Sequence, residues 1–208
     1  MVYNEKQLAI MEAAEALFAE QGFNGTSVRD IAEKAAVNLA MISYYFGSKE
    51  KLLEAIFEYR GEMIKVKLEG IIQHPGATAL EKVNLLVDHY IDKIFLQQAF
   101  HRVLAREQVL HNNPDISALI LKMKKTNQEL IAKLIHEGQK KGEFKKNVDI
   151  PMMMTTMMGT ANFLVTSKHY YKELSNLQSL SEDEFEKHIR KKLNQHLKHI
   201  FKIILTNE

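Results

Sequence analysis

Apolar residues recur at spacings of three and four along most of the chain, the pattern of helices that bury one face. In the first such segment the apolar face consists of Leu8, Met11, Ala14, Leu17 and Phe18, and Gly22 follows as a helix terminator. The predicted helices span residues 5–21, 27–35, 39–45, 49–72, 79–95, 98–111, 115–141, 151–171 and 182–205. Runs that alternate with period two are missing from the sequence, so we predict an all-α fold without a sheet.

The segment after the first helix contains residues typical of a tight loop and a helix start. Gly22 and Gly25 allow the chain to turn sharply. Either Thr26 or Ser27 then supplies a hydroxyl N-cap, and Asp30 has the spacing of a capping-box partner for Ser27. A short helix over residues 27–35 follows.

A second short helix begins after a turn at Ala36 and Val37, with Asn38 as its N-cap. The small side chains of Ala32 and Ala35 let the two helices cross closely. Four apolar residues are expected to point inward: Val37, Met41, Ile42 and Phe46. Two short helices joined by a three-residue turn form a helix-turn-helix.

These residues resemble the TetR family of bacterial repressors. The resemblance lies in Gly-Phe-Asn-Gly-Thr-Ser at 22–27, in Ile31-Ala32, and in Tyr44-Tyr45-Phe46-Gly47-Ser48-Lys49-Glu50-Lys51-Leu52, and it covers about the first 55 residues. It implies a three-helix DNA-binding domain over residues 1–48 and a C-terminal helical bundle domain over residues 49–208 that dimerises and binds a ligand. The protein is therefore expected to be a ligand-responsive repressor.

The sequence departs from the family pattern at two positions. Ala36 stands where the family most often has glycine, and an alanine at positive φ costs roughly 1 kcal/mol. We therefore expect a turn of different shape here. Ser43 stands where an aromatic residue is common, and this change is expected to alter which bases are recognised.

Nine residues are candidates for DNA contact: Thr26, Ser27, Asn38, Leu39, Ala40, Ser43, Tyr44, Tyr45 and Lys49. Asn38 suits a base or a phosphate, Leu39 and Ala40 suit a thymine methyl group, and tyrosine hydroxyls suit phosphates. The resemblance implies that Thr26 and Lys49 clamp phosphates near helix N-termini. The alternative is that the tyrosines pack against the protein, Asn38 only caps its helix, and Lys49 is a solvated charge.

Charge alone does not indicate a nucleic-acid binder, because the net charge is only +2. Residues 1–52 even contain slightly more acidic than basic side chains. DNA contacts must therefore come from a few placed cations, amides and hydroxyls.

The C-terminal domain is expected to form a homodimer that binds a near-palindromic double-stranded DNA operator. The predicted helices 151–171 and 182–205 are the interface candidates. The last helix carries an apolar stripe, namely Phe185, Ile189, Leu193, Leu197, Ile200, Phe201 and Ile204. Burial of this stripe inside one subunit is the alternative explanation.

A methionine-rich segment at residues 152–158 is unusual, because methionines line adaptable binding surfaces and also fill irregular cores. A pocket for a small-molecule effector of apolar or amphipathic character is one interpretation, and core or dimer packing is the other. The pocket candidates are Met63, Tyr90, Phe100, Met123, Met158 and Asn162. A ligand effect near Met63 would reach the DNA-binding helices through the long helix that begins at Lys49.

Other functional classes lack the residues they require. The chain has no cysteine, no Glu-x-x-His pair and no Walker or Gly-x-Ser-x-Gly motif, so we expect no enzyme, no cofactor and no metal site. The histidines His188, His196 and His199 are interpreted as a polar helix face. A helical adaptor that no longer binds DNA is the remaining alternative. No signal peptide or membrane span is evident, which predicts a cytoplasmic protein.

Overall fold

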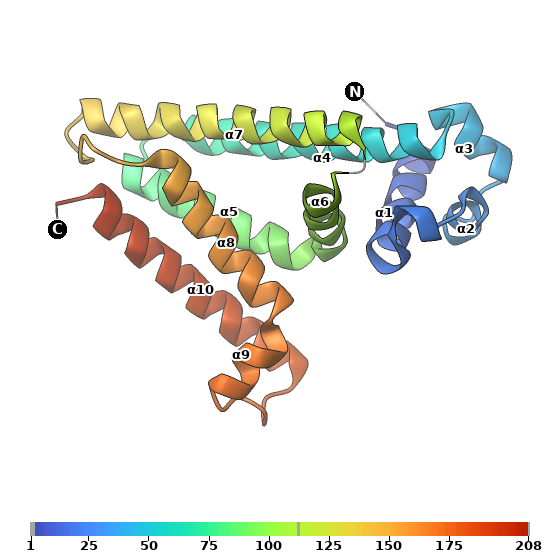
Figure 1. Cartoon of the computed structure of the whole chain (residues 1–208). Coiled ribbons are helices and arrows are strands. Elements are labelled where there is room, and N and C mark those ends of the chain that lie inside the picture. The colour runs from blue at the N-terminus through green and yellow to red at the C-terminus, as the bar shows by residue number, and fades with distance from the viewer. Residues whose placement is uncertain (1–2, 112, 208) are drawn as a thin grey trace. The chain divides into compact units, whose positions relative to one another are not determined.

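The computed structural model describes residues 3–111 and 113–207, and within these residues it consists of helices without strands (Figure 1). The helices are α1 (Glu5–Gly25), α2 (Val28–Lys34), α3 (Leu39–Phe46), α4 (Lys49–Ile72), α5 (Ala79–Leu96), α6 (Gln98–Leu110), α7 (Pro114–Lys140), α8 (Ile150–Thr166), α9 (Lys168–Leu174) and α10 (Glu182–Leu205). The predicted all-α fold is confirmed.

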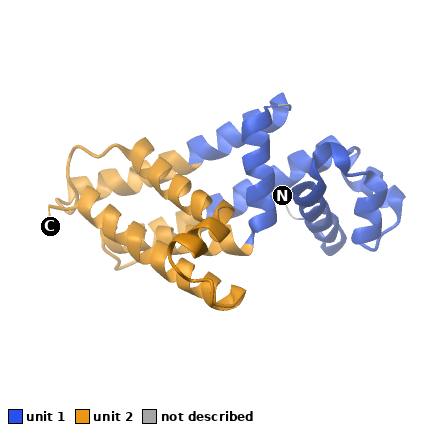
Figure 2. Ribbon diagram, turned by 60° about the horizontal axis from the view of Figure 1, so that its bottom comes forward, with its two compact units in different colours: residues 1–66, 97–126 blue, residues 67–96, 127–208 orange. Residues whose placement is uncertain are grey.

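The chain forms two compact units (Figure 2). The first contains residues 1–66 and 97–126, and the second contains residues 67–96 and 127–208. The chain therefore passes from one unit to the other within α4, at the start of α6 and within α7. The domain boundary expected at residue 49 stays a prediction.

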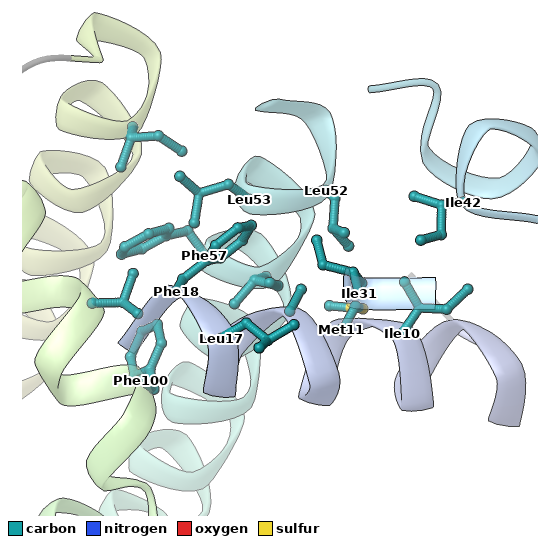
Figure 3. Packing of buried hydrophobic residues seen from close by; sticks show 14 of the residues in the cluster. Ile10, Met11, Leu17, Phe18, Ile31, Ile42, Leu52, Leu53, Phe57 and Phe100 are labelled. Carbon is teal, nitrogen blue, oxygen red and sulfur yellow. The ribbon is translucent and has the colours of Figure 1, made fainter. Parts of the chain in front are cut away.

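The first unit is built around one hydrophobic core that joins α1 to the helix-turn-helix, α4 and α6 (Figure 3). Ile10 and Phe18 of α1 and Leu52 of α4 belong to this buried cluster, and the centroids of the Phe57 and Phe100 rings lie 5.5 Å apart. Burying each such side chain contributes about 1.5 to 3 kcal/mol. The short α2 and α3 are thus held by a core that other helices complete.

A partly buried ion pair also connects α1 with α4. The Arg60 guanidinium donates from Nε to Glu15 Oε2 at 2.9 Å and from Nη2 to Oε1 at 3.0 Å. Both oxygens are paired, which is the arrangement that compensates a desolvated carboxylate.

Burial, together with the nearby Arg60 charge, lowers the pKa of His101 to about 4, so its imidazole is neutral at physiological pH.

In the second unit α5 packs against α8 and α10. Five residues of the α10 stripe are buried within this subunit: Phe185, Ile189, Leu193, Leu197 and Phe201. Ile200 and Ile204 are half-buried. The stripe is therefore explained mainly by packing inside one subunit, the alternative to an interface role.

The predicted helix over residues 151–171 is wrong in one respect, because it is broken at Ser167. This residue leaves the helical conformation, with φ −113° and ψ 26°, and separates α8 from α9. The Thr166 hydroxyl donates to the Asn162 carbonyl at 2.8 Å. Serine and threonine side chains that bond to the local backbone in this way favour helix ends over helix interiors.

The turn between α2 and α3 keeps a left-handed residue at Ala36, which has φ +52°. The expectation that alanine would give the turn a different backbone shape is therefore wrong. Backbone bonds on both sides hold it there, from Ala36 N to Glu33 O at 3.1 Å and from Val37 N to Ala32 O at 3.0 Å. The protein tolerates the strain because neighbouring hydrogen bonds and the core fix the turn.

We predict that Ala36→Gly raises the free energy of unfolding by about 0.5 to 1 kcal/mol, because glycine relieves the left-handed strain and the exposed methyl group packs little. Chemical denaturation followed by circular dichroism measures the change. Ala40→Gly is the matched control, since Ala40 is exposed but helical and should lose about 1 kcal/mol. A loss of stability in both variants would contradict the strain at Ala36.

Candidate nucleic-acid interface

The short helix α3 leaves most of its surface open. Ile42 is its one fully buried residue among the described residues, and Val37, Met41 and Phe46 are half-buried against the core. On the opposite side lie the exposed residues Asn38, Leu39, Ala40, Ser43 and Tyr44. The predicted inward and outward faces of this helix are therefore confirmed, and the contacts of the outer face with DNA stay a prediction.

Asn38 caps α3 with its side-chain oxygen, which accepts a hydrogen bond from Ala40 N at 2.9 Å. The cap occupies the acceptor of the side chain. Its amide NH₂ group supplies two donors at the exposed start of the helix. The cap and a polar contact to a base or phosphate are thus compatible.

The two adjacent tyrosines occupy different environments. The Tyr44 side chain is 83% exposed, whereas Tyr45 is half-buried and packs against the core cluster. Their ring centroids lie 5.1 Å apart in an edge-to-face arrangement. The packing interpretation therefore holds for the Tyr45 ring, and Tyr44 is the tyrosine that projects from the helix.

The N-terminus of α2 has the predicted capping box. Ser27 Oγ accepts from Asp30 N at 3.1 Å, and Ser27 N donates to Asp30 Oδ2 at 2.8 Å. Hydrogen bonds from the side chain and the backbone N–H of Ser27 to the Asp30 carboxylate lower the pKa of Asp30. The Ser27 hydroxyl thus accepts from Asp30 N and is also the side-chain partner of the Asp30 carboxylate.

Thr26 and Lys49 are engaged with the protein itself. The Thr26 side chain is 1% exposed, and its hydroxyl donates to the Gly22 carbonyl at 2.8 Å. The Lys49 ammonium donates to the carbonyls of Phe23 and Thr26, both at 2.8 Å. The phosphate-clamp role expected for their side chains stays a prediction, but both polar groups have partners within the unit.

The sequence analysis missed two residues beside this surface. Arg29 is an exposed cation in the first turn of α2. Because helix N-termini favour anions, Arg29 lies beside a position that suits a phosphate. Tyr3 packs on Phe46 at the end of α3, with ring centroids 6.4 Å apart, and on Tyr59 of α4 at 5.7 Å. The position of Arg29 two residues after a cap could have revealed it, whereas a lone aromatic before the first helix carried no pattern.

The six pocket candidates are divided between the two units. Met63, Phe100 and Met123 belong to the first unit, and Tyr90, Met158 and Asn162 belong to the second. Phe100 is 1% exposed within the first core, so packing explains it.

The other candidates range from exposed to buried. Met63 and Asn162 are exposed, while Met123 packs beside Gly61 and Met158 is half-buried. Burial raises the pKa of Tyr90 to about 12. Their role in binding stays a prediction.

Three histidines of α10 form the polar face predicted for this helix. His196 and His199 are exposed and His188 is half-buried. Across residues 3–111 and 113–207, no group of three or more acidic or histidine side chains is arranged to hold a metal ion. No helix in the described part of the chain combines the length and apolar character needed to cross a bilayer.

Two family models match the chain. Residues 10–56 match the model of bacterial regulatory proteins of the tetR family, and residues 80–195 match the tetracyclin repressor-like C-terminal domain. The first match contains α2, α3 and the start of α4, and the second extends over most of the helices behind them.

Individual relatives agree with these matches. The chain is 27% identical over 184 residues to the fatty acid metabolism regulator protein of Bacillus subtilis, covering 87% of this chain and 92% of that protein. It is 28% identical to the HTH-type transcriptional repressor NicS of Pseudomonas putida, covering 77% and 76%. The structure of FadR from Bacillus subtilis in complex with stearoyl-CoA superposes with a TM-score of 0.65 at 23% identity, covering 91% and 96%.

The order of helices, the capped helix-turn-helix with its exposed face and the two model matches have one explanation. The chain belongs to the TetR family of bacterial regulatory proteins and is a DNA-binding transcriptional regulator.

Proposed function

We propose that the protein acts in the cytoplasm as a ligand-responsive repressor that binds a palindromic operator as a homodimer. The observation that carries the DNA-binding part is the open face of α3, on which Leu39, Ser43 and Tyr44 are exposed while Ile42 anchors the helix. In a helix-turn-helix the second helix enters the major groove. Ser43 and Asn38 are then the polar groups that read base edges, with Leu39 and Ala40 against thymine methyl groups.

Phosphate contacts in this proposal come from groups around the rim of the recognition helix. The Tyr44 hydroxyl and the Arg29 guanidinium have the exposure and chemistry to donate to phosphate oxygens. The acidic side chains among residues 1–52 make a few such contacts more important than overall charge.

We predict that Tyr44→Ala weakens operator binding by about tenfold, corresponding to a lost contact of roughly 1 to 2 kcal/mol. Because its side chain is 83% exposed, the thermal unfolding midpoint should stay unchanged. Fluorescence anisotropy with labelled operator DNA measures the affinity. Tyr170→Ala is the matched control, since this tyrosine is also exposed, at 58%, but lies on α9. Equal affinities of wild type and Tyr44→Ala would overturn the assignment.

For the homodimer we propose that the exposed face of α8 packs against a second copy of the chain. Met152 and Phe163 are 60% and 56% exposed on this helix. The hydroxyls of Thr155 and Thr156 donate back to backbone carbonyls of their own helix, at 2.9 Å each, which reduces the polarity of the surface.

Gly159 lies in the middle of α8, and nothing lies within 4 Å of the position that a Cβ would occupy. A glycine inside a helix costs about 0.5 to 1 kcal/mol relative to alanine, and packing within the subunit does not require it here. Close approach of a helix from a second copy would explain it.

Gly159→Leu should weaken dimerisation by at least about tenfold, because overpacking an interface costs roughly 1 to 3 kcal/mol. Analytical ultracentrifugation gives the dissociation constant. Gly70→Leu serves as the control, since Gly70 is also exposed inside a helix with open space around its Cβ position. A dimer equally tight in both variants, or a monomeric wild type, would refute the α8 interface.

The effector is proposed to be amphipathic, with hydrogen-bond donors on an apolar body. Within the described residues of the second unit, the side-chain oxygens of Asn84 on α5 and Asn127 on α7 are buried without a hydrogen-bond partner. Unsatisfied buried acceptors are costly, so each requires an explanation such as a ligand donor. The half-buried Met158 supplies adaptable apolar surface on α8 of the same unit.

Stearoyl-CoA is a suitable first probe, because the superposed FadR structure contains it and its amide groups donate hydrogen bonds. We expect it to weaken operator binding at least about tenfold, the effect of coupling of roughly 1.4 kcal/mol. Asn84→Leu should abolish this response while raising the unfolding midpoint of the ligand-free protein, since it removes an unsatisfied group. No response of wild type to saturating stearoyl-CoA would exclude this effector, and a lowered midpoint in Asn84→Leu would contradict the unsatisfied oxygen.

Signal transmission would use α4, which runs from Lys49 to Ile72 as one helix. An effector that favours one position of this helix shifts the population of states in which two recognition helices lie roughly 34 to 36 Å apart, the spacing of one DNA turn.

A further inference from the structure

Lys49 stands at a position where the start of a helix does not favour a lysine. Lys49 is the first residue of α4, where the helix dipole disfavours a positive charge. Its neighbour Glu50 behaves as expected there, since hydrogen bonds from its own backbone N–H and from Ser48 lower the pKa of its carboxyl group. A lysine at this position therefore requires a compensating partner elsewhere.

That partner is the C-terminal end of α1 and the loop that follows it. The Lys49 Nζ atom donates to Phe23 O and Thr26 O, each at 2.8 Å, and lies 4.2 Å from the centroid of the Phe23 ring. Two carbonyls and an aromatic face thus converge on one ammonium group, which is partly buried. A compact point charge with several donors suits this arrangement.

Helix α1 itself has no basic residue in its last turn, although its C-terminal carbonyls carry partial negative charge. Cations from other helices supply the positive charge that faces these carbonyls. Besides Lys49 of α4, Arg106 of α6 donates from Nη1 to Phe18 O at 3.3 Å. The loop after α1 leads directly to Ser27, the N-cap of α2, so whatever fixes this loop also fixes the start of the helix-turn-helix.

We propose that Lys49 is a positioning residue for DNA binding, which holds the α1–α2 loop against the start of α4 and thereby orients α2 and α3, and that its contribution to operator affinity does not come from pairing with a phosphate. This proposal rests on the DNA-binding function proposed above. Thr26 belongs to the same hydrogen-bond network, because its carbonyl accepts from Lys49 and its hydroxyl donates to the Gly22 carbonyl.

Three variants of the full-length protein separate positioning from phosphate contact. Lys49→Met keeps most of the stem and removes the ammonium. Lys49→Arg keeps a positive charge that is able to pair with a phosphate. The planar fork of arginine, however, does not fit a site built for one nitrogen. Lys51→Met is the matched control, because Lys51 lies two residues further along α4 and pairs only locally, with Glu54 at 2.7 Å.

The first readout is operator affinity as a function of salt concentration. We expect Lys49→Met and Lys49→Arg each to bind at least about tenfold more weakly, with the slope of log K against log salt unchanged. Loss of a phosphate contact would instead reduce the slope by about 0.9 in Lys49→Met. A reduced slope, or full affinity in Lys49→Arg, would overturn the proposal.

The second readout needs no DNA. The Thr26 amide donates to Phe23 O at 3.3 Å, so amide hydrogen exchange of residues 22–28 reports whether the loop is held. We expect exchange at least about tenfold faster in both Lys49 variants and unchanged exchange in Lys51→Met. Unchanged exchange in Lys49→Met would refute the positioning role. If the wild type binds no DNA but exchange is still faster in the Lys49 variants than in the wild type, the proposed function is rejected and the positioning role is kept.

Discussion

The recognition helix must be held firmly by very few contacts, and this constraint governs the rest of the first unit. A helix of eight residues that is to enter a DNA groove cannot bury more than one side, and in α3 only Ile42 is fully buried. Such a short helix is marginal by itself. Its position therefore depends on the core beneath Ile42, to which α1, α4 and α6 contribute.

Polar contacts complete what this hydrophobic anchor cannot do alone. Caps fix the starts of α2 and α3, the Glu15–Arg60 ion pair connects α1 with α4, and the Lys49 ammonium joins the end of α1 to the start of α4. The ion pair and the Lys49 contacts involve no residue of the exposed face of α3, whereas Asn38 both caps this helix and lies at its exposed start. Apart from Asn38, the surface available for DNA is consequently free of these stabilising side chains.

The same separation explains what could be predicted from the sequence. Helix positions and the inward and outward faces of α3 follow from spacing, and the caps at Ser27 and Asn38 follow from residues two to three positions apart. The hydrogen bonds of Lys49 join residues 26 and 23 positions apart, so no local pattern indicates them. The left-handed Ala36 was misjudged because its local preference is overruled by the surrounding structure. The break at Ser167 was missed because no glycine or proline marks it in the sequence.

The central claim is that this TetR-family regulator reads DNA through the open face of α3 in a two-fold dimer. Selection from random duplex DNA with the purified protein, followed by sequencing, tests it most directly. The account predicts enrichment of an inverted repeat whose half-sites are spaced by about one helical turn, roughly 10 base pairs, and whose binding weakens steeply with salt. No enriched sequence with folded, dimeric, effector-free protein would contradict it and leave the helix-turn-helix as a structural element only.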